Sequence, residues 1–102
     1  MAQNLRTAGY VRLTGIVETA EEGGFVSLCP ELGIASQGES IEEALANLGE
    51  AIDAHLESLV SLGELDRVLQ EKRIEVLRKI PRDAVSVSVT PGTVVSPLVA
   101  AL

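Results

Sequence analysis

Hydrophobic and polar residues alternate through the first third of the chain, a pattern typical of half-buried strands. Between residues 10 and 17, one face carries the small and apolar set Val11, Leu13, Gly15 and Val17. Turn residues at 21–24 are followed by a β-rich run at 25–29, which predicts an antiparallel hairpin that ends at Pro30. Residues 34–37 are expected to add a third short strand.

A helical pattern begins at Ser40. Ser40 and Glu43 fit a capping box, in which the hydroxyl and the carboxylate each accept a hydrogen bond from an unpaired N–H group of the first turn. The apolar residues then recur at steps of three and four along one stripe: Ile41, Leu45, Leu48, Ile52, Leu56 and Leu59. Gly63 suits the left-handed position that follows a helix end.

The last third of the chain is less regular. Residues 65–72 predict a second, shorter helix, and residues 73–80 fit a strand or a continued helix, of which we favour the strand. Alternation at 85–90 predicts another strand before the Pro-Gly pair at 91–92, and residues 93–99 are extended. The sequence thus predicts an α+β fold, in which a small antiparallel sheet of three N-terminal strands is covered by one main amphipathic helix. A second short helix and C-terminal strands complete it.

Charge divides the chain into two parts. Residues 1–65 hold 2 basic and 11 acidic residues, a net charge of −9, whereas residues 66–102 hold 6 basic and 4 acidic residues, a net charge of +2. An acidic body argues against direct binding to nucleic acid or to an anionic membrane, because both require a basic face. The chain has neither a signal-peptide core nor an apolar run long enough to cross a membrane, so we expect a cytoplasmic protein.

The C-terminal segment is apolar and uncharged from residue 84 onward. An exposed uncharged strand is an aggregation risk, so we expect this segment to pair within the fold or with another copy. We therefore divide the chain into an α+β domain at 1–80 and a β-rich tail at 81–102. The tail predicts a homo-oligomer, a dimer or tetramer, held through Val85, Val87, Val89, Val94, Val95 and Leu98.

Two motifs carry a resemblance to a known family. One is the Cys-Pro-Glu-Leu strand exit at 29–32, and the other is the helix entry at 37–47, Gln-Gly-Glu-Ser-Ile-Glu-Glu-Ala-Leu-Ala-Asn. Over about residues 10–60 the chain resembles the HicB-like antitoxins. The resemblance implies a partial RNase H-like fold and a partner, the HicA toxin, a small basic ribonuclease that these antitoxins bind and block. The chain departs from the family pattern at Gly33, where a proline is common, and at 66–102, which lack the signals of a DNA-binding domain.

Candidate catalytic groups are scarce, and we predict no enzymatic activity, no cofactor and no metal site. An RNase H-type nuclease needs carboxylates that converge on metal ions, and the first strand, at 9–17, contains no Asp or Glu. His55 is expected to be a partly buried helix residue. The single cysteine, Cys29, is expected to be a small buried apolar residue.

Candidate partner contacts lie at the strand-to-helix connection and on the acidic side of the helix: Ser36, Gln37, Glu42, Glu43, Glu50, Asp53 and Glu57. An acidic surface can compete with RNA for a basic one, and opposite charge speeds the encounter. The leading interpretation is an antitoxin that neutralises a HicA-like, mRNA-cleaving toxin. The alternative is a stand-alone oligomeric binding or scaffold module of HicB type with no toxin partner.

Overall fold

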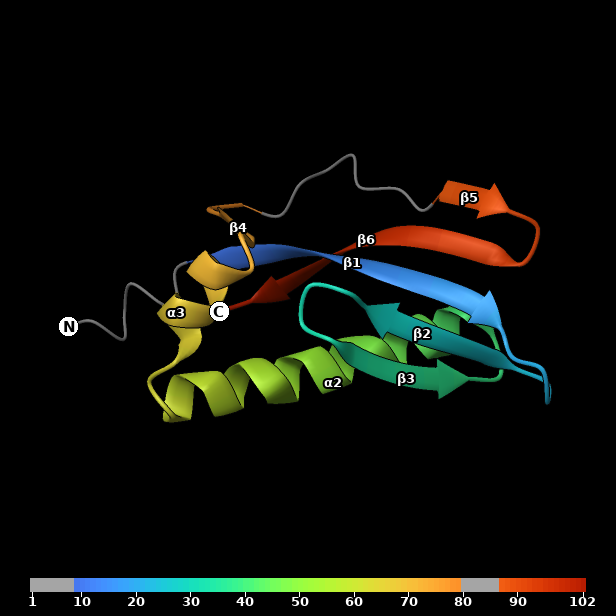
Figure 1. Ribbon diagram of the computed structural model, residues 1–102, viewed down its shortest axis with the longest axis horizontal. Helices are drawn as coiled ribbons and strands as arrows, with labels where there is room; N and C mark the ends of the chain where they lie inside the picture. Colours follow the sequence, from blue (N-terminus) through green and yellow to red (C-terminus); the bar gives the residue numbers. More distant parts are fainter. Residues whose placement is uncertain (1–8, 80–86) are drawn as a thin grey trace.

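The computed structural model describes residues 9–79 and 87–102. It shows a curved antiparallel sheet with a long helix packed across its inner face (Figure 1). The strands are β1 (Tyr10–Thr19), β2 (Phe25–Cys29), β3 (Ile34–Gly38), β4 (Glu75–Leu77), β5 (Val87–Thr90) and β6 (Thr93–Ala101), and the helices are α2 (Ile41–Ser61) and α3 (Leu65–Glu71). The sheet runs in the order β3-β2-β1-β6-β5, and β4 pairs with β1. The predicted α+β class, with one long and one short helix, is confirmed.

Strand β1 shows why the alternating pattern leads to a two-faced sheet. Its odd-numbered residues from Val11 to Val17 are buried, and its even-numbered residues point to the other, outer face. The inner face is tightly filled at Gly15, where an added Cβ would lie 2.9 Å from Leu98 Cδ1 and 3.0 Å from Leu45 Cδ2. A side chain at position 15 would require Leu98 and Leu45 to shift, so glycine lets β6 and α2 approach β1 closely at this point.

The C-terminal segment is a central part of this sheet. Strand β6 pairs with β1 over nine successive residue pairs, from Tyr10–Ala101 to Glu18–Thr93. Residues 93–101 therefore pair within the fold, which is one of the two arrangements expected for this segment. The C-terminal segment shares one sheet with the N-terminal strands. Strand β5 lies at the sheet edge. Residues 85 and 86 of the predicted strand lie outside the described residues.

The start of α2 confirms one half of the predicted capping box and corrects the other. Ser40 Oγ accepts a hydrogen bond from the Glu43 N–H at 3.1 Å, as predicted. The Glu43 carboxylate, however, accepts a hydrogen bond at 2.8 Å from the N–H of Glu39, the residue before the cap residue Ser40. The carboxylate therefore fastens the connection from β3 to the helix instead of pairing an N–H group of the first turn.

The buried stripe of α2 is also shifted slightly from the predicted one. Ile41 and Leu45 are half-buried, and Ala44 is fully buried beside the predicted core residues Leu48, Ile52, Leu56 and Leu59. The cause is a close approach at Gly38, where a Cβ would lie 2.4 Å from the Ala44 backbone nitrogen. Ser27, buried on β2, donates a hydrogen bond from Oγ to the Ala44 carbonyl at 2.8 Å. A small residue at 44 thus lets the first helical turn rest directly on the sheet.

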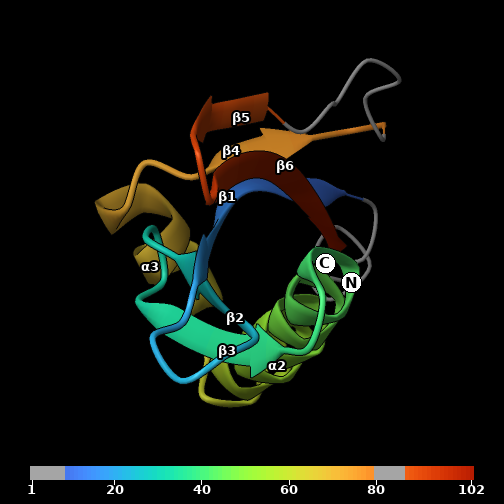
Figure 2. The same cartoon turned by 90° about the vertical axis from the view of Figure 1, so that its right-hand side faces the viewer.

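The chain leaves α2 through the predicted left-handed residue. Gly63 has φ 69°, and the Glu64 N–H donates to the Leu59 carbonyl at 2.9 Å. This pairing closes the helix end and turns the chain into α3. Of the strand favoured for residues 73–80, only Glu75–Leu77 is a strand, β4, which pairs with β1 from Tyr10 to Arg12; residue 80 lies outside the described residues. Figure 2 shows the result along the long axis: the sheet curves around a core that α2 closes from the other side.

Candidate functional site

The outward side of α2 carries an arc of acidic side chains, which we call the acidic helix face. All of its members are exposed: Glu42, Glu43, Glu50, Asp53 and Glu57. At 3.6 residues per turn these positions fall within about 100° of the helix circumference, roughly opposite the buried stripe. The helix contains no Lys or Arg. The structure therefore brings five predicted contact residues together on one continuous surface.

None of the ion pairs between described residues involves a side chain of the acidic helix face. Arg12 pairs with Glu75 at 3.4 Å, and Arg67 pairs with both Glu64 and Glu71 on and beside α3. Like charges three and four positions apart, as at Glu50, Asp53 and Glu57, repel and each cost a helix a few tenths of a kcal/mol. A uniformly acidic helix surface is typical of a solvated face, and it also provides an array of carboxylates that a basic partner could bind.

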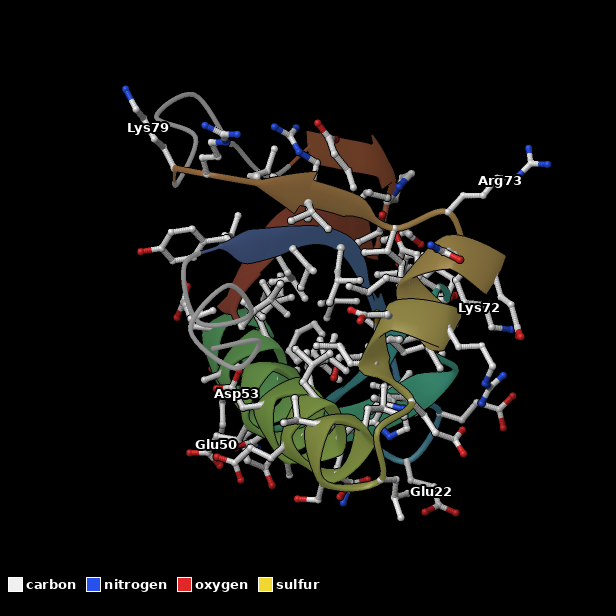
Figure 3. The ribbon with its side chains drawn as sticks, turned by 90° about the vertical axis from the view of Figure 1, so that its left-hand side faces the viewer. Glu22, Glu50, Asp53, Lys72, Arg73 and Lys79 are labelled. Atoms are coloured by element: carbon white, nitrogen blue, oxygen red, sulfur yellow. The ribbon has the colours of Figure 1, made fainter. Side chains whose placement is uncertain are left out.

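Charge is distributed unevenly over the molecule as a whole. Figure 3 shows Glu50 and Asp53 projecting from α2 away from the core, with Arg73 and Lys79 on the opposite side. Lys72 projects from the end of α3. None of these three basic side chains, which the structure describes, therefore lies against the acidic helix face.

Ser36 and Gln37 do not form one contact surface. Gln37 is exposed on the outer face of β3, whereas Ser36 is half-buried on the side that packs against α2. The Gln37 carbonyl accepts a hydrogen bond from Asn47 Nδ2 at 2.8 Å, which ties the edge strand to the helix. Asn47 was part of the recognised motif, but spacing alone could not show its partner.

The residue that sequence reasoning missed is Glu31. Strand β2 pairs with β1 only from Ile16 onward, and β4 pairs with β1 only up to Arg12, so β1 has a gap between them. The Glu31 carboxylate fills this gap. It accepts from the Thr14 N–H at 3.1 Å through Oε1 and from Thr14 Oγ1 at 2.8 Å through Oε2. The glutamate of the Cys-Pro-Glu-Leu motif thus replaces a missing strand neighbour.

A shallow hollow of about 400 Å³ lies over this gap. Its lining combines both charges with apolar groups, and includes Arg12, Glu31, Arg73 and Pro97. Thr14 N–H is directed to Glu31, so the Thr14–Pro97 pair makes no ladder bond between β1 and β6. This explains why a proline is tolerated in the middle of β6.

Cys29 is fully buried next to this gap, as predicted, and its Sγ lies 3.6 Å from Glu31 Oε1. Burial raises the pKa of the Cys29 thiol, and the nearby Glu31 charge acts in the same direction. The thiol is therefore held neutral, which is the form without nucleophilic reactivity. His55 is half-buried on α2, as expected.

The candidate oligomerisation residues are divided between the two faces of the sheet. Val94 and Leu98 stand opposite Val17 and Leu13 on the inner face, whereas Val95 stands opposite Ile16 on the outer face. Val85 lies outside the described residues, and Val87 and Val89 belong to the edge strand β5.

In the described part of the chain, no group of three or more His, Cys, Asp or Glu side chains gathers in a way that could hold a metal ion. No helix in the same residues has the length and apolarity needed to cross a membrane.

Two UPF0150 proteins of Synechocystis sp. are similar to this chain. The UPF0150 protein ssl0738 of Synechocystis sp. is 43% identical over 70 residues, which cover 68% of this chain and 94% of that protein. The chain belongs to the UPF0150 family. A second UPF0150 protein, ssr1765 of the same organism, is 43% identical over 49 residues, which cover 47% of this chain and 62% of that protein. No model of a protein family matches the chain, and no solved structure matches it significantly.

Proposed function

We propose that this UPF0150 protein is a HicB-like antitoxin that binds a small basic ribonuclease of the HicA type and blocks its access to messenger RNA. The observation that carries the proposal is the acidic helix face. UPF0150 membership and the α+β fold, with a helix packed on an antiparallel sheet, agree with the resemblance at the two sequence motifs. The proposal places both partners in the cytoplasm, where messenger RNA is found.

The electrostatic part of the argument is direct. A ribonuclease needs a basic surface for the phosphate backbone, and that surface attracts any rigid array of carboxylates. The acidic helix face offers such an array on a 21-residue helix that is fixed to the sheet by the buried stripe. Opposite charge accelerates association and makes it dependent on salt. The protein acts in this scheme by binding, without catalysis, cofactor or metal, and without nucleic-acid contacts of its own acidic body.

A paired charge reversal tests this role. In the double variant Glu50→Lys, Asp53→Lys, we expect association with the HicA-like toxin to slow by about tenfold or more and to lose most of its salt dependence. Stopped-flow or surface-plasmon measurements at several salt concentrations follow the rate. Cleavage of RNA by the toxin, with the variant added, follows the loss of inhibition.

The matched control reverses two equally exposed charges elsewhere. Glu21 and Glu22 lie in the turn after β1, which is near the start of α2 but outside the acidic helix face, and the double variant Glu21→Lys, Glu22→Lys has the same net charge as the test variant. We expect this control to retain nearly the original rate. Equal slowing by both variants would show that net charge alone matters. Failure of the unaltered protein to bind or inhibit the toxin encoded beside its gene would overturn the proposal.

A second function is favoured by a different observation. The outer face of the sheet carries apolar residues that no described helix covers, including Val26 and Leu28 at 43% and 40% exposure. Such a surface suits the stand-alone oligomeric module as well as the antitoxin. If no small basic protein is encoded beside the gene and none copurifies, the stand-alone module is the better proposal.

A further inference from the structure

The outer face of the sheet departs from the usual composition of a solvent-facing sheet surface. Antiparallel sheets that cover a core on one side normally present polar residues on the other. Here the residues directly opposite one another on neighbouring strands form an outer apolar row, made of Ala35, Leu28, Ile16 and Val95 on β3, β2, β1 and β6. On β6 the row continues into Pro97 and Val99, which share the outer face.

No helix of the described residues covers this row. Helix α2 lies on the inner face, where its own residues Ala44 and Leu48 are buried, and Figures 1 and 2 show the convex side of the sheet free of it. Leu28 is 40% exposed although it is a large hydrophobic residue in a regular strand. A contiguous apolar surface of this kind on a soluble domain marks a contact site.

Charges at the two ends of β1 indicate what the contact is. Along its outer face, β1 has Arg12 near one end, Ile16 between, and Glu18 near the other end, with both charged residues exposed. The six-residue separation corresponds to about 20 Å. The ion pair of Arg12 with Glu75 uses Nε, and a guanidinium has four further N–H donors for another carboxylate.

This arrangement is complementary to itself. When two such sheets pack face to face around a twofold axis that lies in the interface and crosses β1, the two β1 strands run antiparallel. Arg12 of each copy then approaches Glu18 of the other, while the outer apolar rows meet between them. A parallel arrangement would place Arg12 against Arg12 and is disfavoured. The charges therefore select both the partner and its orientation.

We propose that the occupant of this face is a second copy of the chain, which forms a twofold dimer through the outer apolar row. The four strands β3, β2, β1 and β6, each about 4.8 Å wide, span about 20 Å, and strands of five to ten residues span about 17–33 Å, so each copy offers at most roughly 500 Å² on this convex face. The total of roughly 1,000 Å² is at the lower limit for a specific interface, and the dimer is therefore expected to dissociate at micromolar concentrations. The acidic helix face lies on α2, across the core, and stays exposed in both copies.

Sedimentation velocity over a concentration series tests the dimer. The unaltered protein should pass from monomer to dimer as concentration rises. Leu28→Lys and Val26→Lys place a charge at positions that are already half-exposed, so folding should persist, and the dimer dissociation constant should rise at least about tenfold. Circular dichroism of each variant confirms that the fold is retained.

A charge exchange tests the orientation. Arg12→Glu and Glu18→Arg should each weaken the dimer, and the double variant with both changes should restore it to within about threefold of the original. Glu50→Lys, which changes charge on α2, is the control and should leave the dimer unaffected. A monomer at all concentrations, or a dimer that withstands Leu28→Lys and Val26→Lys, overturns the proposal. A double charge variant weaker than both single variants overturns the orientation. None of these outcomes depends on toxin binding, which is measured separately.

Discussion

The two faces of the sheet contain similar residues and differ in what covers them. On the inner face, Leu13 is 1% exposed beneath α2, whereas on the outer face Leu28 is 40% exposed. Both positions are leucines in strands with clean alternation. The comparison teaches that hydrophobicity along a strand predicts which residues need a neighbour, but the neighbour itself is set by the helices and, in the proposed dimer, by the second copy.

The largest expected effect comes from comparing one leucine on each face. Leu13→Ala removes a fully buried side chain and should reduce the free energy of unfolding by about 2–5 kcal/mol. Leu28→Ala should reduce it by less than about 1 kcal/mol in the monomer, because its side chain already meets water. Urea unfolding followed by circular dichroism, at the lowest practical concentration, measures both. Equal losses would mean that the outer face is covered even in the monomer.

A smaller effect is expected where Glu31 bridges the gap in β1. Glu31→Ala leaves the Thr14 N–H without its acceptor and should cost about 1–3 kcal/mol. Glu31→Gln keeps a carbonyl oxygen at the same length and should recover part of this loss. Hydrogen exchange at the Thr14 amide provides a local readout. If exchange there were unchanged in Glu31→Ala, the carboxylate would not be acting as the missing strand neighbour.

A gain in the free energy of unfolding is expected from a substitution at the end of α3, beside the hollow on the outer side of the sheet. Arg73 occupies a left-handed backbone position, φ 53°, that matches Gly63 at the end of α2. Arg73→Gly should therefore stabilise the protein by about 1 kcal/mol, since a residue with a Cβ is strained there. Thermal unfolding of the variant checks this, with Lys72→Gly, at a right-handed neighbour, as the control that should not stabilise.

The smallest effect concerns pH on the inner face. The pKa of Cys29 is raised above its ordinary value of 9.0 by burial, so the unfolded chain ionises at a lower pH than the folded one. The stabilisation is fully present below about pH 9 and is lost as pH rises through the folded-state pKa. Stability should fall more steeply above pH 9 in the unaltered protein than in Cys29→Ala. Parallel slopes in urea titrations would contradict this assignment.

Local patterns predicted the elements well, because each depends on residues that are close in sequence. The alternation of β1, the hydroxyl of Ser40 and the left-handed position of Gly63 all appear where expected. The same holds for the acidic helix face, since a helix of known start fixes which side each carboxylate takes. The burial of Ala44 was not predicted, because it depends on Gly38 at the end of strand β3, where the missing side chain lets the helix approach.

Contacts between distant segments could not be obtained in this way. The spacing of Glu31 and Thr14 carries no signal that one will bind the other, because the bond arises only when β2 and β4 leave the same part of β1 unpaired. The separation of Ser36 from Gln37 likewise follows from strand parity once β3 has an inner and an outer side.

The chain alone therefore determined the kinds of element, their order and the charge of the long helix, because backbone preference, capping and periodicity act over a few residues. Tertiary structure decided that β6 lies beside β1, that Val95 faces outward while Val94 faces the core, and that Arg12 and Glu18 lie along β1 on either side of the outer apolar row. These features depend on strand register, because shifting one strand by a single residue would exchange its inner-facing and outer-facing side chains.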